Sequence, residues 1–133
     1  MIIAVDFDGT LVEHRFPDIG MPSPGAFDAL REFQEAGASL ILLTMRSLNG
    51  SEGDTLTPAV DYCRAKGIKF YAVNDNPSQT KWTSSRKVFA HIYIDDMAFG
   101  CPLRESPRVG GRPMVDWSKV TPQVLERLRK KAA

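Results

Sequence analysis

The first residues of the chain constrain its fold more than any other stretch. Met1–Val5 form a continuous apolar run, and Asp6 follows directly, with Asp8, Gly9 and Thr10 close behind. A short apolar run with β-branched members is typical of a strand buried on both faces, as in a parallel sheet. Asp6 then lies at the carboxyl end of that strand, where open α/β sheets bind ligands. Asp8 lies on the same side if the extended geometry continues, while Gly9 permits a turn.

Apolar runs and helical patterns alternate along the chain as far as residue 94. We predict further strands at 38–44, 68–73 and 91–94, and helices at 23–37, 57–67 and 121–131. Each helix begins at a Ser-Pro or Thr-Pro pair, which is a helix N-terminal signal. The alternation predicts an α/β fold, namely a three-layer α/β/α Rossmann-like domain with a mostly parallel sheet. The Pro- and Gly-rich segment 100–115 is expected to be a long loop or a short hairpin.

Length and composition set broad limits on what the chain does. The 133 residues fit one domain spanning 1–133, and the net charge of +1 gives no general attraction for nucleic acid or membranes. Cys63 and Cys101 match neither a disulfide framework nor a zinc-site spacing, so we expect both to be buried thiols. The N-terminus lacks a basic leader and a long apolar segment, so a cytoplasmic location is expected.

Polar residues follow three of the predicted strands, at the point where each strand ends. These residues are Asp6 and Asp8, Thr44 and Arg46, and Asp95 and Asp96. Because parallel strands place their carboxyl ends at one edge of the sheet, we expect these side chains to converge. Four carboxylates gathered so closely repel one another, and a hard divalent cation with oxygen ligands resolves that conflict. Magnesium suits a site shared by carboxylates and phosphate.

Four short motifs occur in an order that resembles the haloacid dehalogenase superfamily. They are Val-Asp-Phe-Asp-Gly-Thr-Leu at 5–11, Leu-Leu-Thr at 42–44, Lys87, and Ile-Asp-Asp at 94–96. The resemblance covers residues 1–100. The segment after the first motif, Glu-His-Arg-Phe-Pro-Asp-Ile-Gly at 13–20, also resembles that of small bacterial members without a cap domain. It implies a HAD-like hydrolase core that carries no cap.

The resemblance implies a magnesium-dependent phosphatase that hydrolyses a phosphomonoester through an aspartyl-phosphate. Asp6 would attack phosphorus, and Asp8 would protonate the leaving oxygen and then deprotonate water. Thr44 would hydrogen-bond a phosphoryl oxygen. Lys87 would neutralise charge on the phosphoryl group and on Asp6, with Lys81 as a competitor for this role.

The same resemblance implies further contacts to the metal and to the phosphoryl group. Asp6 would bind magnesium through its side chain and Asp8 through its main-chain carbonyl. Either Asp95 or Asp96 could be the third ligand, and we favour Asp96 as the direct ligand with Asp95 beside it. Additional phosphate-binding residues are expected to be Gly9, Thr10 and Arg46.

Several alternatives stay open from the sequence. A capless site is open, so it admits a bulky phosphorylated substrate or depends on a neighbouring subunit in a homo-oligomer for closure. One alternative function is a nucleic-acid-end phosphatase, which the near-neutral charge does not support. Another is a phosphate-sensing or scaffold domain without turnover.

Other residues have weaker functional signals. His14 follows the first motif and is placed either at the entrance of the site or in a structural role, whereas His91 is expected to be structural. The arginines of the 100–115 segment are interpreted as a solvated face that could touch an anionic substrate. Trp117 is expected to pack against the base of that segment.

Overall fold

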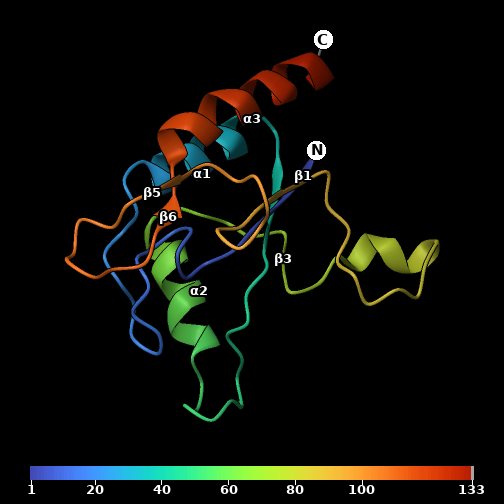
Figure 1. The fold of residues 1–133 in the computed structure, drawn as a ribbon. Coiled ribbons are helices and arrows are strands. Elements are labelled where there is room, and N and C mark those ends of the chain that lie inside the picture. Colours follow the sequence, from blue (N-terminus) through green and yellow to red (C-terminus); the bar gives the residue numbers. More distant parts are fainter. Residues whose placement is uncertain (133) are drawn as a thin grey trace.

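The computed structural model describes residues 1–132, and a four-stranded parallel sheet forms its centre (Figure 1). The strand order is β3-β2-β1-β4, which confirms the predicted α/β class with a parallel sheet. The sheet strands are β1 (Ile2–Val5), β2 (Ser39–Leu42), β3 (Ala72–Val73) and β4 (Ile92–Ile94). The remaining elements are α1 (Ala26–Glu35), α2 (Leu56–Ala65), η1 (Pro77–Lys81), β5 (Leu103–Arg104), β6 (Met114–Val115) and α3 (Trp117–Ala132).

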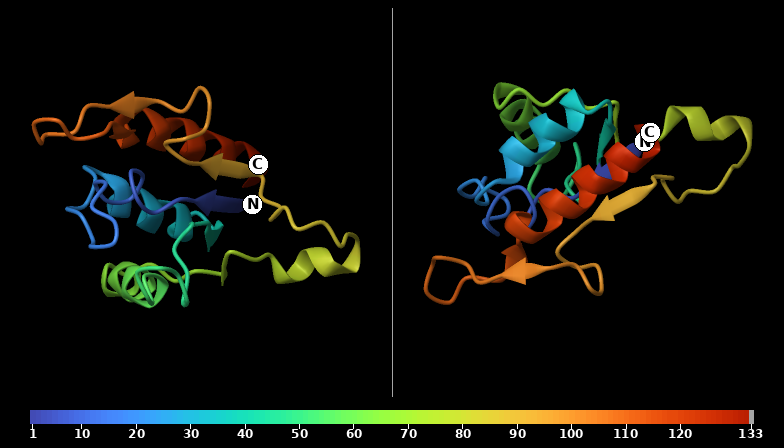
Figure 2. Two further views of the ribbon diagram at one scale, coloured as in Figure 1. Left: turned by 60° about the horizontal axis from the view of Figure 1, so that its bottom comes forward. Right: turned by 90° about the horizontal axis from the view of Figure 1, so that it is seen from above.

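The alternation of side chains along the strands gives the sheet two different faces. Ile3 and Val5 of β1 belong to the large core, which also takes the buried side chains of α1, α2 and α3. Ala4 of the same strand points the other way, into a small cluster with Ile41 and Ala90. From the chain between β3 and β4, Val88 and Ala90 pack on this second side. In Figure 2, η1 projects beyond the end of the sheet at which β1 begins.

The boundaries of several elements differ from the predicted ones for local reasons. The prediction that Thr121-Pro122 starts the last helix is wrong, because α3 begins at Trp117. The Asp116 carboxylate accepts a hydrogen bond from the Ser118 N–H at 3.1 Å and so supplies the cap. Strand β3 is limited to Ala72–Val73 at the sheet edge, although an apolar run begins at residue 68.

The C-terminal part of the chain is fixed to the turn that follows β1. Strands β5 and β6 pair antiparallel, so of the two expected forms, a long loop or a short hairpin, the segment is a hairpin, with residues 105–113 connecting its strands. The Val115 N–H donates to the Gly9 carbonyl at 3.0 Å, and the buried Trp117 indole N–H donates to the Thr10 carbonyl at 2.7 Å. Within residues 1–132, no helix has the length and apolar character needed to cross a membrane.

Candidate active site

Three carboxylates meet at the carboxyl ends of β1 and β4. Asp6, Asp95 and Asp96 each offer an oxygen, and these oxygens lie within 4.8 Å of one another. The register of the sheet brings them together, because Val5 pairs with Ile94 and the Asp6 N–H donates to the Ile94 carbonyl at 3.0 Å. The convergence predicted from the strand ends is therefore present for these three acids.

Thr10 links the acid after β1 to the acids after β4. Its hydroxyl donates to Asp6 Oδ2 at 3.0 Å and accepts the Asp96 N–H at 3.2 Å. The residue is fully buried. Both hydrogen-bonding roles of the hydroxyl are thus used to hold the two acids in place.

His14 stands beside Asp96 at the same site. Its Nε2 lies 3.0 Å from Asp96 Oδ2. Gly9 makes this approach possible, since its φ is 81° and a Cβ at this position would overlap the His14 ring and crowd Asp96. His14 thus lines the pocket beside Asp96.

The acid cluster perturbs its own ionisation. Burial, followed by the charge of Asp95 and the neighbouring Asp96 carboxyl, raises the pKa of Asp6 to about 8. Burial also raises the pKa of Asp95. A bound cation would remove this repulsion, and three carboxylate oxygens are hard ligands of the type that magnesium takes. The residues present thus fit a hard divalent cation.

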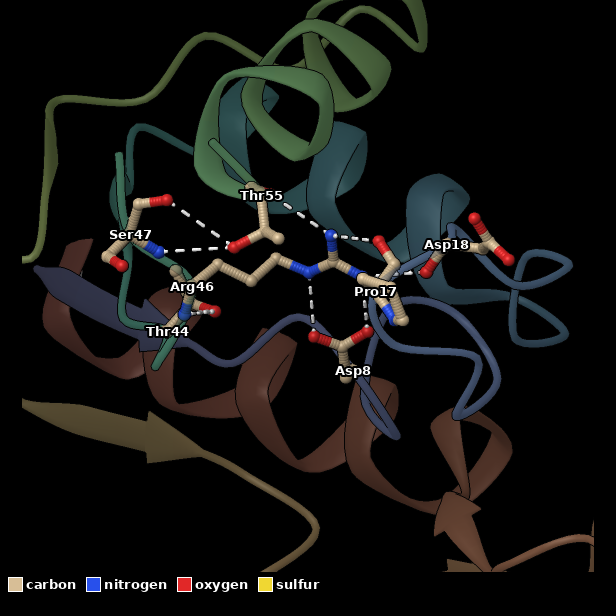
Figure 3. Close-up of polar contacts among 7 residues, drawn as sticks. All are labelled: Asp8, Pro17, Asp18, Thr44, Arg46, Ser47 and Thr55. Atoms are coloured by element: carbon tan, nitrogen blue, oxygen red, sulfur yellow. Dashed lines mark hydrogen bonds and ion pairs between the residues drawn. The ribbon is translucent and has the colours of Figure 1, made fainter. Parts of the chain in front are cut away.

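Asp8 occupies a different position, because it is held by Arg46 (Figure 3). Arg46 Nε and Nη2 donate to the two Asp8 oxygens, each at 2.8 Å. The other N–H groups of the guanidinium donate to main-chain carbonyls of Pro17, Asp18 and Thr55. Arg46 is 2% exposed, so it joins three separate segments inside the protein.

Gly9, Thr10 and Arg46, which the sequence predicts as phosphate contacts, make internal hydrogen bonds. All five N–H donors of Arg46 are used by the contacts described above. The Gly9 N–H donates to the Val12 carbonyl at 2.8 Å, and the Thr10 N–H donates to the Phe7 carbonyl at 3.1 Å. In this arrangement the three residues hold the loops around the site together through internal hydrogen bonds.

Thr44 lines the acidic pocket after β2, as the strand-end argument predicted. Its hydroxyl accepts the Arg46 N–H at 3.2 Å, and its own N–H donates to the Asn74 side chain at 2.8 Å. The hydroxyl proton has no partner among these contacts and is available to a phosphoryl oxygen.

The two candidate lysines lie outside the pocket lining. The Lys87 ammonium lies over the Tyr93 ring, 5.7 Å from its centre. Tyr93 precedes Asp95 by two residues in the chain. Lys81 belongs to η1, which projects from the opposite end of the sheet (Figure 2).

The pocket around the acids also contains Arg112, one of the arginines of the 100–115 segment, and three residues that the sequence did not single out. It has a volume of about 330 Å³. Its additional lining residues are Phe16, Met45, Met97 and Arg112. Met45 and Met97 directly follow Thr44 and Asp96, so adjacency to the motifs was the available signal. Phe16 and Arg112 come from irregular segments whose course the sequence does not define.

These features define a protein with a Rossmann-like α/β fold and an acidic site at the carboxyl ends of its strands. No family model and no curated protein matches the chain. A solved structure of a conserved protein from Bacteroides thetaiotaomicron is 39% identical, with a TM-score of 0.71, over 96% of this chain and 91% of that chain. The chain belongs to the same family as that conserved protein.

A second solved structure shows a much weaker likeness. The D,D-heptose 1,7-bisphosphate phosphatase from B. bronchiseptica, complexed with magnesium and phosphate, is 21% identical. Its TM-score is 0.43, over 54% of this chain and 47% of that chain. Similarity at this level transfers neither details of the site nor function.

Proposed function

We propose that this protein is a capless hydrolase of the haloacid dehalogenase superfamily, which hydrolyses a phosphomonoester through an aspartyl-phosphate. The observation that carries the proposal is the cluster of Asp6, Asp95 and Asp96, with carboxylate oxygens within 4.8 Å of one another at the strand ends. The first-motif residue Asp8 and the strand-end residue Thr44 line the same pocket. Together they provide a nucleophile, a proton carrier and a hydrogen-bond donor.

Asp6 is the proposed nucleophile. One carboxylate oxygen attacks phosphorus and forms the aspartyl-phosphate bond, while the bond from phosphorus to the leaving oxygen breaks with its electron pair on that oxygen. Water then attacks phosphorus, and the bond to Asp6 breaks with its electron pair returning to the carboxylate. Inorganic phosphate and the alcohol are the products.

Asp8 is the proposed proton carrier. In its protonated form it gives the proton to the leaving oxygen, and it then takes a proton from the attacking water. Arg46 acts as a positioning residue, because its two hydrogen bonds of 2.8 Å fix the orientation of the Asp8 carboxyl group. Because Arg46 is buried, water does not compete for these hydrogen bonds.

Asp6, Asp95 and Asp96 would hold magnesium, with the main-chain carbonyl of Asp8 as a further ligand. When bound, the ion offsets the negative charge of the carboxylates and polarises the phosphoryl oxygens. Lys87 is the proposed lysine of the site. Its ammonium contacts Tyr93, and it would have to move from that ring toward Asp6 to take part in the reaction. The contact of Lys87 with Tyr93, two residues before Asp95, favours it over Lys81.

The test is magnesium-dependent release of phosphate from a simple phosphomonoester. Asp6→Asn is expected to abolish release, and acid-quenched mass spectrometry of the wild type is expected to locate phosphate on Asp6. Asp61→Asn is the matched control, because Asp61 is exposed on α2. Full activity in Asp6→Asn would exclude this nucleophile. Binding of magnesium and phosphate without turnover of any ester would instead support the non-catalytic alternative.

A further inference from the structure

Apolar side chains surround the mouth of the acidic pocket. Phe16, Met45 and Met97 line it and are 54%, 97% and 76% exposed, respectively. Met45 directly follows Thr44, and Met97 directly follows Asp96. Each methionine is therefore the sequence neighbour of a residue with a proposed role in the reaction. Exposed apolar groups gathered at the opening of a polar site are typical of ligand-binding surfaces.

Phe16 is held in place by the arginine that positions Asp8. The Arg46 guanidinium lies 5.2 Å from the centre of the Phe16 ring and 5.0 Å from the centre of the Phe7 ring. Phe7 is fully buried and Phe16 is exposed, so the guanidinium packs on the buried Phe7 ring and holds the Phe16 ring at the surface. Phe16 is thus a fixed aromatic surface at the pocket mouth.

Arg112 belongs to the loop that precedes β6 and lies at the mouth of the pocket. Its Nη2 lies 4.0 Å from the Met97 sulfur, and it lines the pocket with the acids. Within residues 1–132, Arg112 forms no ion pair. Its planar guanidinium therefore has donors for a phosphoryl oxygen and a face for a ring. The 100–115 segment contributes to the site through this residue.

We propose that the mouth of the pocket binds an aromatic group of the substrate, so that the substrate class is a phosphomonoester whose alcohol carries an aromatic ring. This inference rests on the proposed function. A ring packed against Phe16 and between the thioethers of Met45 and Met97 removes apolar surface from water. A polyhydroxylated alcohol, such as a sugar, makes no comparable contact. The volume of about 330 Å³ holds a phosphoryl group with one ring at its opening.

The ring can be joined close to the ester, as in a benzyl ester, or more remotely, as in the base of a nucleotide. The experiment compares kcat/KM for benzyl phosphate, a nucleoside 5′-monophosphate and glycerol 1-phosphate. All three release a primary alcohol, so leaving-group chemistry is closely matched. One or both aromatic esters are expected to exceed glycerol 1-phosphate by about tenfold, which corresponds to about 1.4 kcal/mol. The preferred aromatic ester identifies where the ring is attached.

Variants connect this preference to the mouth. The ratio of aromatic to glycerol ester is expected to fall toward one in Phe16→Ala/Met45→Gln/Met97→Gln. Met21→Gln is the matched control, because Met21 is a 66% exposed methionine outside the pocket. Equal kcat/KM for the three esters in the wild type, or an unchanged ratio in the triple variant, would overturn the inference.

The failure of the inference is distinguishable from failure of the proposed function. If no ester is hydrolysed, the phosphatase proposal fails, and binding of benzylphosphonate with magnesium by calorimetry then tests the mouth separately. The wild type is expected to bind it more tightly than methylphosphonate by about tenfold, and the triple variant to bind the two alike. Equal binding of the two phosphonates by the wild type would reject an aromatic subsite.

Discussion

Arg46 binds Asp8 through two parallel hydrogen bonds of 2.8 Å each, and this pair is buried on the arginine side. The same guanidinium donates hydrogen bonds to main-chain carbonyls of the loop after β1 and of the residue before α2. One side chain thus orients Asp8, the second acid of the first motif, and connects two loops around the site. Its removal has consequences for both stability and activity.

We expect Arg46→Met to lower the free energy of unfolding by about 3–5 kcal/mol, because it leaves Asp8 without its partner and several carbonyls without donors. Urea denaturation measures this change. Arg64→Met is the control, since Arg64 lies 3.8 Å from Asp61 in an exposed pair, and its loss is expected to cost less than about 1 kcal/mol. Equal losses in the two variants would show that the buried contacts of Arg46 do not stabilise the fold.

Thr10→Val is expected to destabilise the protein by about 1–3 kcal/mol, since the Asp96 N–H and Asp6 each lose a hydrogen-bond partner. Thr10→Ser keeps the hydroxyl and should retain most of the stability. Thr80→Val provides the control, because the Thr80 hydroxyl makes an exposed contact of 3.3 Å to Pro77. Thermal unfolding distinguishes these variants. A Thr10→Ser variant as unstable as Thr10→Val would refute the role of the hydroxyl.

The raised pKa of Asp6 predicts how metal-free stability depends on pH. The pKa of this group is about 8 in the folded protein and near 3.8 when unfolded, so the folded state holds the proton more tightly. Its stabilising contribution is complete below about 3.8 and is lost as pH rises to 8 and beyond. Without metal, Tm should therefore decline across this window.

Asp6→Asn is expected to flatten this decline, measured by melting scans in a chelator from pH 4 to about 8.5. Part of the slope should remain, since the pKa of Asp95 is also raised. Added magnesium should increase Tm most at the high end of the window, where all the acids are ionised. Identical pH profiles for the wild type and Asp6→Asn would contradict the assigned ionisation of Asp6.

Lys87→Gln is expected to reduce kcat by at least about tenfold if this lysine approaches Asp6 during the reaction. Lys81→Gln should leave kcat unchanged, because Lys81 lies in η1. Steady-state kinetics with magnesium and one phosphomonoester decide between them. The opposite order of effects would assign the role to Lys81, and no effect of either would remove both lysines from the mechanism.

The sheet and its acid cluster could be predicted because they depend on strand ends. Apolar runs define β1 and β4, and parallel pairing then brings Asp6 and Asp95 together without knowledge of any loop. The partner of Asp8 could not be predicted in the same way. The Arg46 side chain reaches Asp8 across two irregular loops, and neither periodicity nor turn signals define their course.

The positions of Lys87 and of the apolar residues at the pocket mouth could not be predicted from the sequence for a related reason. Lys87 follows η1, whose direction depends on contacts such as the hydrogen bond that the Phe89 N–H donates to the Gln79 side-chain oxygen at 2.8 Å. Exposed residues such as Met45 leave no periodic pattern, because neither core packing nor strand alternation selects them. Residues at strand ends can therefore be predicted from the sequence, whereas the residues at the mouth of the pocket cannot.

The hydrogen bond from Trp117 to the Thr10 carbonyl gives the protein an internal fluorophore at its active-site turn. The chain has 2 tryptophans, and the other, Trp82, is 64% exposed. In a Trp82→Phe background, tryptophan emission comes from Trp117 alone, whose indole nitrogen lies 2.7 Å from the Thr10 carbonyl oxygen. We expect a ligand that moves this turn to shift the emission wavelength of Trp117, so that binding at the acids can be followed without an added label.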